Sequence, residues 1–445
     1  MSTIRVGILT RSEVRVIFNG KYSCEGNMYE GEHTLSEAGV YIPTSDDCTF
    51  DLCDVTIGID FHWERNETQT FKGSLEVMKA KNGGLTAVNV LDIEDYLQSV
   101  ISSEMSATSH MELLKAHAVI SRSWALCKIQ RSLQASSFAC QESEVKRICW
   151  YGSEPHEGFD VCADDHCQRY QGLRAKDHKN AIKAVQETKG EVLAYLKEAS
   201  TSSATGKEGS AIELLTPNSS LLTPNSHYVI CDARYYKSCG GVTEEFETCW
   251  EDTHHDYLVK VVDRKASTSS ATALDLTKEE NAREWIMGNP DAFCNTNDKE
   301  ILSQVLNDYD QETIDFYRWK VSYTTEELSK LIRRKSGIDF GEIEQLVPIK
   351  RGVSGRIYEL KIVGTKKTLT IGKELEIRKW LSESHLYSSA FIVEKENDTF
   401  TLYGAGWGHG VGLCQIGAAV MATKGYTYKE ILAHYYPNTI IAEGN

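Results

Sequence analysis

The sequence predicts an α+β fold in which antiparallel β-rich lobes and flanking helices border a groove. Short β-branched and aromatic runs, broken by Gly, Asn and Asp, fill residues 1–90 and indicate antiparallel strands. Helical patterns begin after residue 91, and strands and helices are then segregated along the chain rather than strictly alternating. A chain of 445 residues also exceeds the roughly 250–300 residues at which single cores stop growing, so we expect several lobes.

We predict three lobes in chain order. Residues 1–90 form the N-terminal β lobe, and residues 91–265 form a catalytic core. Within this core, residues 199–226 are rich in Ser, Thr, Asn and Gly and nearly repeat the heptapeptide LLTPNSS. Such a segment cannot bury enough apolar surface to offset its ordering entropy, so we interpret it as a low-complexity insertion. Residues 266–445 form a C-terminal α+β lobe that completes the groove.

The first predicted helices meet near Glu104. The segment LDIEDYLQSVISSEM places apolar residues on one helical face and predicts a helix that ends at Glu104. Ser109, followed three residues later by Glu112, has the pattern of a capping box and predicts the start of the next helix. Glu104 is therefore expected at a helix-to-helix junction, where a carboxylate can face a cleft.

Composition excludes several classes of protein. Acidic residues exceed basic ones by 16, which argues against a nucleic-acid partner because duplex binding depends on Lys and Arg neutralising phosphates. No stretch approaches the roughly 20 apolar residues of a transmembrane segment. The amino terminus, MSTIRVGILTRSEVRVIFNG, lacks the features of a secretory signal. Thirteen cysteines, mostly single and in apolar or helical contexts, favour reduced, buried thiols and a reducing compartment.

Three separated segments together resemble the stage II sporulation protein D/amidase-enhancer family of peptidoglycan-active proteins. They are YLQSVISSEMSATSHMELLKAHAVISRSWAL (96–126), DARYYKSCGGVTEEFETCWE (232–251) and GWGHGVGLCQIGAAVMATKGYTYKEILAHYYPNT (406–439). Their order and content both match the family. The stretch around Arg122 departs from the usual pattern, because His117, Ser121 and Trp124 stand where relatives usually have Gln, Ala and Tyr.

The resemblance implies that Glu104 is the catalytic residue, because the family's glutamate occupies the S-E-M position that Ser103, Glu104 and Met105 fill. Without that resemblance, a glutamate is expected on the surface. A lytic transglycosylase needs a single carboxylic acid. It protonates the glycosidic oxygen as oxocarbenium-like charge develops, then takes the proton of the 6-hydroxyl of the same muramic sugar. The product is a 1,6-anhydro sugar, and no second carboxylate is required.

Four further residues are candidate substrate contacts by resemblance, each with a structural alternative. Arg122 either holds a sugar carboxylate or N-acetyl group and orients Glu104, or makes a structural ion pair. Ser238, Gly240 and Gly241 in the S-C-G-G sequence form either a wall of the groove or a tight turn between strands.

His409 and Gln415 complete the candidate substrate-binding set. His409 lies in GWGHGVG, where small neighbours give its ring access to the groove and its ordinary pKa is near neutrality. A lone histidine is more often structural, and only the family context raises the functional alternative. The glycines lack the βαβ context and distant acidic residue of a dinucleotide fingerprint, so we expect no organic cofactor.

A candidate zinc site lies in the segment HEGFDVCADDHC. His156, Cys162, His166 and Cys167 supply two imidazoles and two thiolates, which suit tetrahedral zinc. Some members of the resembled family bind a metal through this arrangement. Four protein ligands would leave no open position, so the ion would brace the groove rather than activate water. The alternative is a Cys162–Cys167 disulfide or a pair of thiols.

The function implied by the resemblance is a lytic transglycosylase that cleaves peptidoglycan glycan strands between N-acetylmuramic acid and N-acetylglucosamine. The alternative is a non-catalytic protein of the same fold that binds glycan and enhances a cell-wall amidase. A thiol redox or zinc-regulatory protein is a third class, suggested by the cysteine count. The family implies the cell envelope, although the chain as written shows no export signal.

Overall fold

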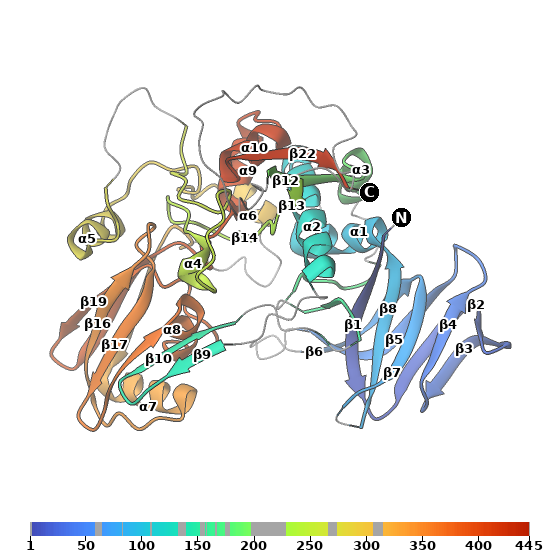
Figure 1. Ribbon diagram of the computed structural model, residues 1–445, viewed down its shortest axis with the longest axis horizontal. Coiled ribbons are helices and arrows are strands. Elements are labelled where there is room, and N and C mark those ends of the chain that lie inside the picture. Colours follow the sequence, from blue (N-terminus) through green and yellow to red (C-terminus); the bar gives the residue numbers. More distant parts are fainter. Residues whose placement is uncertain are drawn as a thin grey trace, which may run out of the picture.

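The computed structural model describes residues 2–57, 65–81, 83–106, 109–131, 139–151, 156, 158–164, 167–173, 179–196, 228–265, 274–305 and 315–444. The predicted insertion at 199–226 and the zinc candidate His166 lie outside the described residues. The fold is mixed α and β with an antiparallel-rich sheet, which confirms the α+β prediction. Two β-rich parts lie at opposite ends, with helices between them (Figure 1).

The N-terminal part is a curled nine-stranded sheet with the order β11-β1-β8-β7-β4-β2-β5-β6, in which β3 also pairs with β2. Neighbours are antiparallel except β1 and β11. Side chains along β2 alternate, with Val14, Val16 and Phe18 buried, as expected for one apolar face. The strands are β1 (Thr3–Arg11), β2 (Val14–Cys24), β3 (Asn27–Leu35), β4 (Gly39–Pro43), β5 (Thr49–Ile57), β6 (Arg65–Lys72), β7 (Ser74–Lys79), β8 (Leu85–Asp92) and β11 (Val161–Cys162).

Helices α1 (Ile93–Glu104) and α2 (Met111–Arg131) follow this sheet. The Asp92 carboxylate caps α1 by accepting from the N–H of Glu94 at 2.8 Å, and α1 ends at Glu104 as predicted. The predicted capping box at Ser109 is wrong. Its hydroxyl donates to the carbonyl of Gln304 at 2.7 Å, and the N–H of Glu112 donates instead to Nδ1 of His110 at 3.3 Å.

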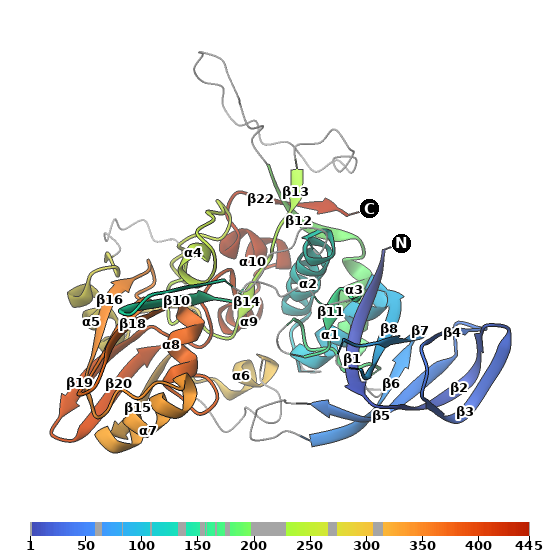
Figure 2. The same cartoon turned by 60° about the horizontal axis from the view of Figure 1, so that its bottom comes forward.

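The opposite end contains a five-stranded sheet, β16-β17-β18-β10-β9, and a three-stranded sheet, β15-β20-β19, around a second apolar core. The β9–β10 hairpin belongs to the middle of the sequence but lies in this C-terminal sheet, where β10 pairs in parallel with β18 (Figure 2). The strands are β9 (Ala139–Glu142), β10 (Lys146–Trp150), β15 (Arg318–Thr324), β16 (Ile343–Arg351), β17 (Ile357–Gly364), β18 (Thr368–Gly372), β19 (Phe391–Glu396) and β20 (Thr399–Ala405).

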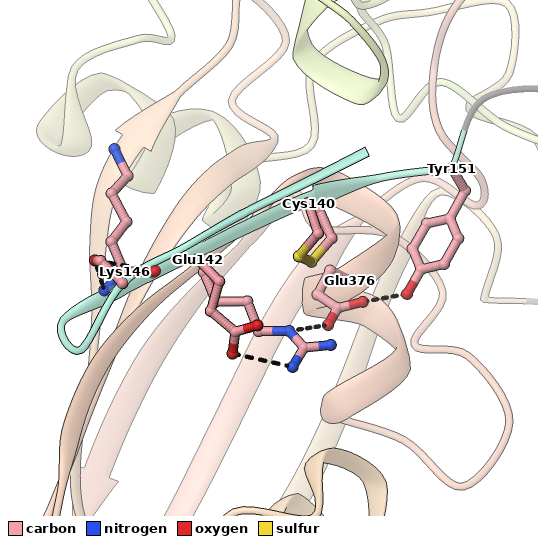
Figure 3. The surroundings of a disulfide bond; sticks show 8 residues. Cys140, Glu142, Lys146, Tyr151 and Glu376 are labelled. Carbon is pink, nitrogen blue, oxygen red and sulfur yellow. Dashed lines mark hydrogen bonds and ion pairs between the residues drawn. A yellow bond between two sulfur atoms is a disulfide. The ribbon is translucent and has the colours of Figure 1, made fainter. Parts of the chain in front are cut away.

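A disulfide joins Cys140 and Cys149, which face each other across the hairpin (Figure 3). Figure 3 also shows Tyr151, just after β10, hydrogen-bonded to Glu376. The other cysteines in the described residues are thiols, most of them buried, in agreement with the sequence prediction.

The remaining elements lie around α1 and α2 or, like α5, α7 and α8, against the C-terminal sheets. Two small sheets lie in this region: β14 pairs with β21, and β12 pairs with both β13 and β22. The described helices include none long and apolar enough to cross a membrane. The elements are α3 (Lys179–Glu187), β12 (Glu191–Leu196), β13 (Tyr228–Ile230), β14 (Tyr235–Tyr236), α4 (Phe246–Cys249), α5 (Glu279–Met287), α6 (Lys299–Val305), α7 (Thr325–Ser336), α8 (Glu374–Trp380), β21 (Leu413–Cys414), α9 (Gln415–Thr423), α10 (Tyr428–Tyr435) and β22 (Thr439–Glu443).

Candidate functional site

Glu104 lies at the C-terminal end of α1 with its side chain half-buried. Its Oε1 atom accepts two hydrogen bonds, one from the backbone N–H of Arg169 at 3.2 Å and one from the hydroxyl of Tyr235 at 3.4 Å. Tyr235 begins β14, which leads into the S-C-G-G turn. The carboxyl group therefore lies where the first two of the resembling segments meet.

The third segment holds Tyr235 in place through His409. The ring Nε2 of His409 donates to the carbonyl of Tyr235 at 3.1 Å, and its Nδ1 accepts from the N–H of Val411 at 3.0 Å. The ring lies 5.0 Å from that of Trp250 and 5.2 Å from that of Tyr236. Burial, followed by the charge of Arg234, lowers the pKa of His409 well below its usual range.

The structure places His409 beside Tyr235, and substrate binding by His409 stays a prediction. Both ring nitrogens are occupied by main-chain groups, and a neutral imidazole has only one donor and one acceptor. His409 positions Tyr235, and through it acts on Glu104.

Gln415 is buried and reaches the site through His117. Nε2 of the Gln415 amide lies 3.1 Å from Nε2 of His117, while Nδ1 of His117 lies 3.1 Å from the hydroxyl of Ser121. Burial lowers the pKa of His117 to about 3, so the ring is neutral near pH 7. The amide therefore donates to Nε2, and Nδ1–H donates to Ser121. The His117 ring packs edge-on against Tyr235 at 4.6 Å, so Gln415 supports Tyr235 through His117. A substrate contact by Gln415 stays a prediction.

The same contacts explain two of the departures from the family pattern. A histidine at position 117 has a second ring nitrogen that a glutamine lacks, and a buried nitrogen without a partner is costly. Ser121, one helical turn later, supplies the hydroxyl that bonds to it. His117 and Ser121 thus form a coupled pair.

The S-C-G-G turn packs back-to-back against the glycine-rich loop. Ser238 and Trp407 exchange backbone hydrogen bonds of 3.0 and 2.8 Å. Gly240 has a φ of +73°, and a Cβ there would lie 2.8 Å from the nitrogen of Gly406. Gly241 has a φ of +109°, and its Cβ would lie 2.7 Å from the ring of Trp285. Ser238, Gly240 and Gly241 therefore form a tight turn that supports the Tyr235 strand. Their role as a wall of the groove stays a prediction.

Arg122 is not near Glu104 and makes the structural ion pair. Its Nε and Nη2 atoms bond to the two carboxylate oxygens of Glu94 at 2.8 and 2.6 Å, and Nη1 donates to the carbonyl of Glu191 at 3.0 Å. The Arg122 side chain is 1% exposed. Glu94 and Glu104 are at opposite ends of α1, about 15 Å apart along its axis at 1.5 Å per residue. The alternatives of binding a sugar or orienting Glu104 do not fit this position.

Three of the four candidate zinc ligands lie together. The donor atoms of His156, Cys162 and Cys167 are within 4.8 Å of one another, with His156 Nε2 3.2 Å from Cys167 Sγ. The structure describes both cysteines as thiols rather than a disulfide. A hydrogen bond with Cys162, together with burial, raises the pKa of the Cys167 thiol well above its usual range. Two sulfurs and one imidazole at this spacing fit three of the four ligands of a tetrahedral zinc site.

The loop that carries these cysteines also holds the Glu104 carboxyl. Gln168, next to Cys167, accepts from the hydroxyl of Tyr96 at 3.0 Å, and the following N–H of Arg169 is the one that bonds to Glu104. A metal bound here would fix the position of that N–H.

Sequence reasoning missed Tyr235 and Arg169. Tyr235 lies within the second resembling segment, where the paired tyrosines were visible but carried no sign of which one faces Glu104. Arg169 contributes a backbone N–H, which any residue except proline can supply. Two cavities of about 450 and 540 Å³, lined by residues around Glu94 and around Trp380, do not include Glu104.

Parts of the chain are similar to known proteins. Residues 81–195 match the model of the stage II sporulation protein family, and residues 244–412 match a domain of unknown function (DUF8618). The amidase enhancer of Bacillus subtilis (strain 168) is 26% identical over 358 residues, which cover 78% of this chain and 40% of that protein. An uncharacterised protein of Brachyspira hyodysenteriae (strain ATCC 49526 / WA1) is 24% identical over 367 residues, which cover 82% of this chain and 70% of that protein. Stage II sporulation protein D of Bacillus subtilis (strain 168) is 39% identical over 74 residues, which cover 17% of this chain and 22% of that protein.

The segment with α1, α2 and Glu104 is therefore similar to the stage II sporulation proteins. The named relatives, an amidase enhancer and stage II sporulation protein D, agree with the resemblance found in the sequence. The chain spans about two-fifths of the length of the amidase enhancer that it matches.

Proposed function

We propose that this protein is a lytic transglycosylase that cleaves peptidoglycan strands between N-acetylmuramic acid and N-acetylglucosamine, with Glu104 as its single acid and base. The observation that carries the proposal is the setting of Glu104. Its half-buried carboxyl group is held by Arg169 and Tyr235 where distant segments of the chain meet. A positioned carboxyl group of this kind is what general acid–base catalysis requires.

The two hydrogen bonds assign different roles to the two carboxyl oxygens. Because Oε1 accepts from both Arg169 and Tyr235, a protonated Glu104 carries its proton on Oε2. Oε2 would give that proton to the glycosidic oxygen as the bond to the muramic sugar breaks. It would then take the proton of the 6-hydroxyl as that oxygen attacks the anomeric carbon. The carboxyl group ends the cycle protonated again, and the sugar is released in its 1,6-anhydro form.

The neighbouring acidic residues support a mechanism with one carboxyl group. A retaining or inverting hydrolase needs a partner carboxylate within roughly 5–9.5 Å. Three acidic residues near Glu104 in sequence are engaged elsewhere: Glu94 with Arg122, Asp95 with Lys72, and Glu112 with the N–H of Tyr428.

Product analysis tests the reaction type. Purified full-length protein is incubated with glycan strands stripped of their peptides and, in parallel, with intact peptidoglycan, and the products are identified by mass spectrometry. We expect 1,6-anhydromuramic ends that accumulate with time. Reducing ends without anhydro sugars would instead identify a hydrolase and contradict the proposal.

A second candidate function is enhancement of a cell-wall amidase by a non-catalytic glycan-binding protein. It is favoured by the alignment of the Bacillus subtilis amidase enhancer over 78% of this chain. The same protein preparation distinguishes the two functions. If no strand is cut, but addition of the protein raises the rate at which an amidase releases peptides, the enhancer function holds.

We further propose that zinc bound by His156, Cys162 and Cys167 has a structural role. The double variant C162A/C167A is expected to lose about one zinc ion per chain and to have a lower Tm, because an ion that binds only the folded state stabilises it. Metal analysis and thermal unfolding measure the two effects. Cys53→Ala, which changes a partly buried thiol on β5, is the control and should keep the zinc. Equal zinc content in both variants would rule out this site.

A further inference from the structure

A second group of possible metal ligands lies in the interior, beyond the strand that carries Tyr235. It consists of Cys239, Asp263, Cys294 and Cys414, whose ligand atoms all lie within 4.8 Å of one another. Their exposures are 3%, 0%, 1% and 0%, respectively. Cys239 is in the S-C-G-G turn and Cys414 ends β21, whereas Asp263 and Cys294 lie in irregular segments on either side of α5.

The spacing of these atoms suits a single tetrahedral ion. Zinc–sulfur bonds of about 2.3 Å place two sulfurs of a tetrahedral site about 3.8 Å apart. The Sγ atoms of Cys239 and Cys294 are 3.4 Å apart, and the other pairs are within 4.8 Å. A small closure or expansion of the cluster would bring all four ligands to one ion.

The sulfur atoms receive backbone N–H groups, as thiolate ligands of metals do. The N–H of Gly241 donates to Cys239 Sγ at 3.3 Å. Cys414 Sγ accepts from the N–H groups of Cys239 at 3.3 Å and Gly417 at 3.4 Å. Thiols are weak acceptors, so several N–H groups directed at sulfur indicate a site arranged for negative charge.

Asp263 is likewise held in the orientation of a ligand. One of its oxygens accepts from the hydroxyl of Tyr435 at 2.5 Å, and the other accepts from the N–H of Cys294 at 2.8 Å. A Cβ on Gly417 would lie 2.7 Å from the carboxylate, so no side chain at that position can fill the space.

The cluster is closed off from water. Asp263 is 0% exposed, its Oδ1 lies 3.9 Å from Nε2 of His434, and Nη1 of Arg356 donates to the carbonyl of Cys239 at 3.4 Å. Burying a carboxylate and thiolates is costly unless they are paired or coordinate a metal, and a divalent cation would offset that cost.

We propose that Cys239, Asp263, Cys294 and Cys414 bind one structural zinc ion. Zinc is the ion that prefers tetrahedral sulfur-rich sites, and four protein ligands without an open position define a structural rather than a catalytic role. Binding releases the protons of the three thiols to solvent. No redox step is involved. The site goes beyond the proposed function, because its occupancy does not depend on which reaction the protein performs.

The ion would join three parts of the chain that support Glu104. Cys239 follows Tyr235 by four residues, and Cys414 precedes Gln415, which bonds to His117. It would therefore fasten β14 to β21 and both strands to the segment that carries Asp263.

Metal analysis in a background without the first zinc site tests this proposal. The full-length C162A/C167A variant, purified without chelator, is expected to retain about one zinc ion per chain. Adding Cys239→Ala and Cys414→Ala should reduce zinc to background, whereas adding Cys231→Ala should not. Cys231 is the matched control, because its thiol is equally buried but lies outside the cluster.

A second measurement covers the case in which the cysteine variants do not fold. Zinc in the folded C162A/C167A protein is exchanged for cobalt(II), and thiolate-to-cobalt charge-transfer bands with strong d–d bands of a tetrahedral site are expected. Thiols are counted after denaturation of the same protein. Absence of bound metal, iron in place of zinc, or loss of two thiols to a Cys239–Cys294 disulfide would each overturn the proposal. None of these readouts depends on cleavage of glycan.

Discussion

Glu104→Gln is expected to lower the rate of glycan-strand cleavage by about 10²–10⁴-fold, the usual contribution of a positioned acid–base group. Glutamine has the same size, and its amide oxygen can still accept from Arg169 and Tyr235. It has no acidic proton to give to the glycosidic oxygen. The measurement is the initial rate at which 1,6-anhydro ends appear on peptide-free strands.

The control for this variant is Glu326→Gln on α7, where the side chain is 75% exposed. It should cleave at the wild-type rate, and both variants should unfold at the wild-type temperature. If Glu104→Gln is as active as the control, Glu104 is not the acid and base. If both variants and the wild type are inert while an added amidase is stimulated, the enhancer function replaces the enzymatic one.

Arg122→Ala is expected to reduce the free energy of unfolding by about 3–5 kcal/mol, because removing one partner of a buried pair leaves the other charge uncompensated. Arg122 is 1% exposed and Glu94 is 16% exposed, so the carboxylate left behind has little access to water. The guanidinium also bridges α1 to the carbonyl of Glu191 at the start of β12. Urea-induced unfolding measures the change.

The comparison variant is Arg15→Ala, which breaks an ion pair with Asp54 whose side chains are 53% and 59% exposed. A solvent-exposed ion pair contributes at most about 1 kcal/mol to the free energy of unfolding, so the stability of this variant should be close to that of the wild type. Glu94→Gln combined with Arg122→Met should recover part of the loss, since no charge is then left unpaired. An Arg122→Ala protein of normal stability that fails to bind glycan would restore the substrate-contact alternative.

The position of Glu104 could be predicted from sequence because it depends on local patterns. Apolar periodicity fixed the end of α1, and the S-E-M motif singled out one glutamate among many. The role of Arg122 could not be predicted in the same way. An arginine on a helix has the same sequence context whether it faces a groove or a buried carboxylate, and only packing against Glu94 distinguishes the two.

The roles of loop residues were harder to predict from the sequence than those of helix residues. The glycines around His409 suggested free access for its ring, but they also let the backbone come close enough to occupy both ring nitrogens. The cluster of Cys239, Asp263, Cys294 and Cys414 joins residues up to 175 positions apart, as the separation of Cys239 from Cys414 shows. No periodic or spaced motif links them, and the high cysteine count was the only sequence signal.

The pairing of the β9–β10 hairpin with a strand far along the chain affects the order in which the protein can fold during its synthesis. β10 pairs with β18, and β12 pairs with β22, whose residues 439–443 are synthesised about 250 residues after β12 begins. Pairings over such sequence separations form slowly, because the entropy of closing long loops must be lost before the contacts form. During synthesis, β10 and β12 are therefore expected to remain without these partner strands until β18 and β22 have been translated.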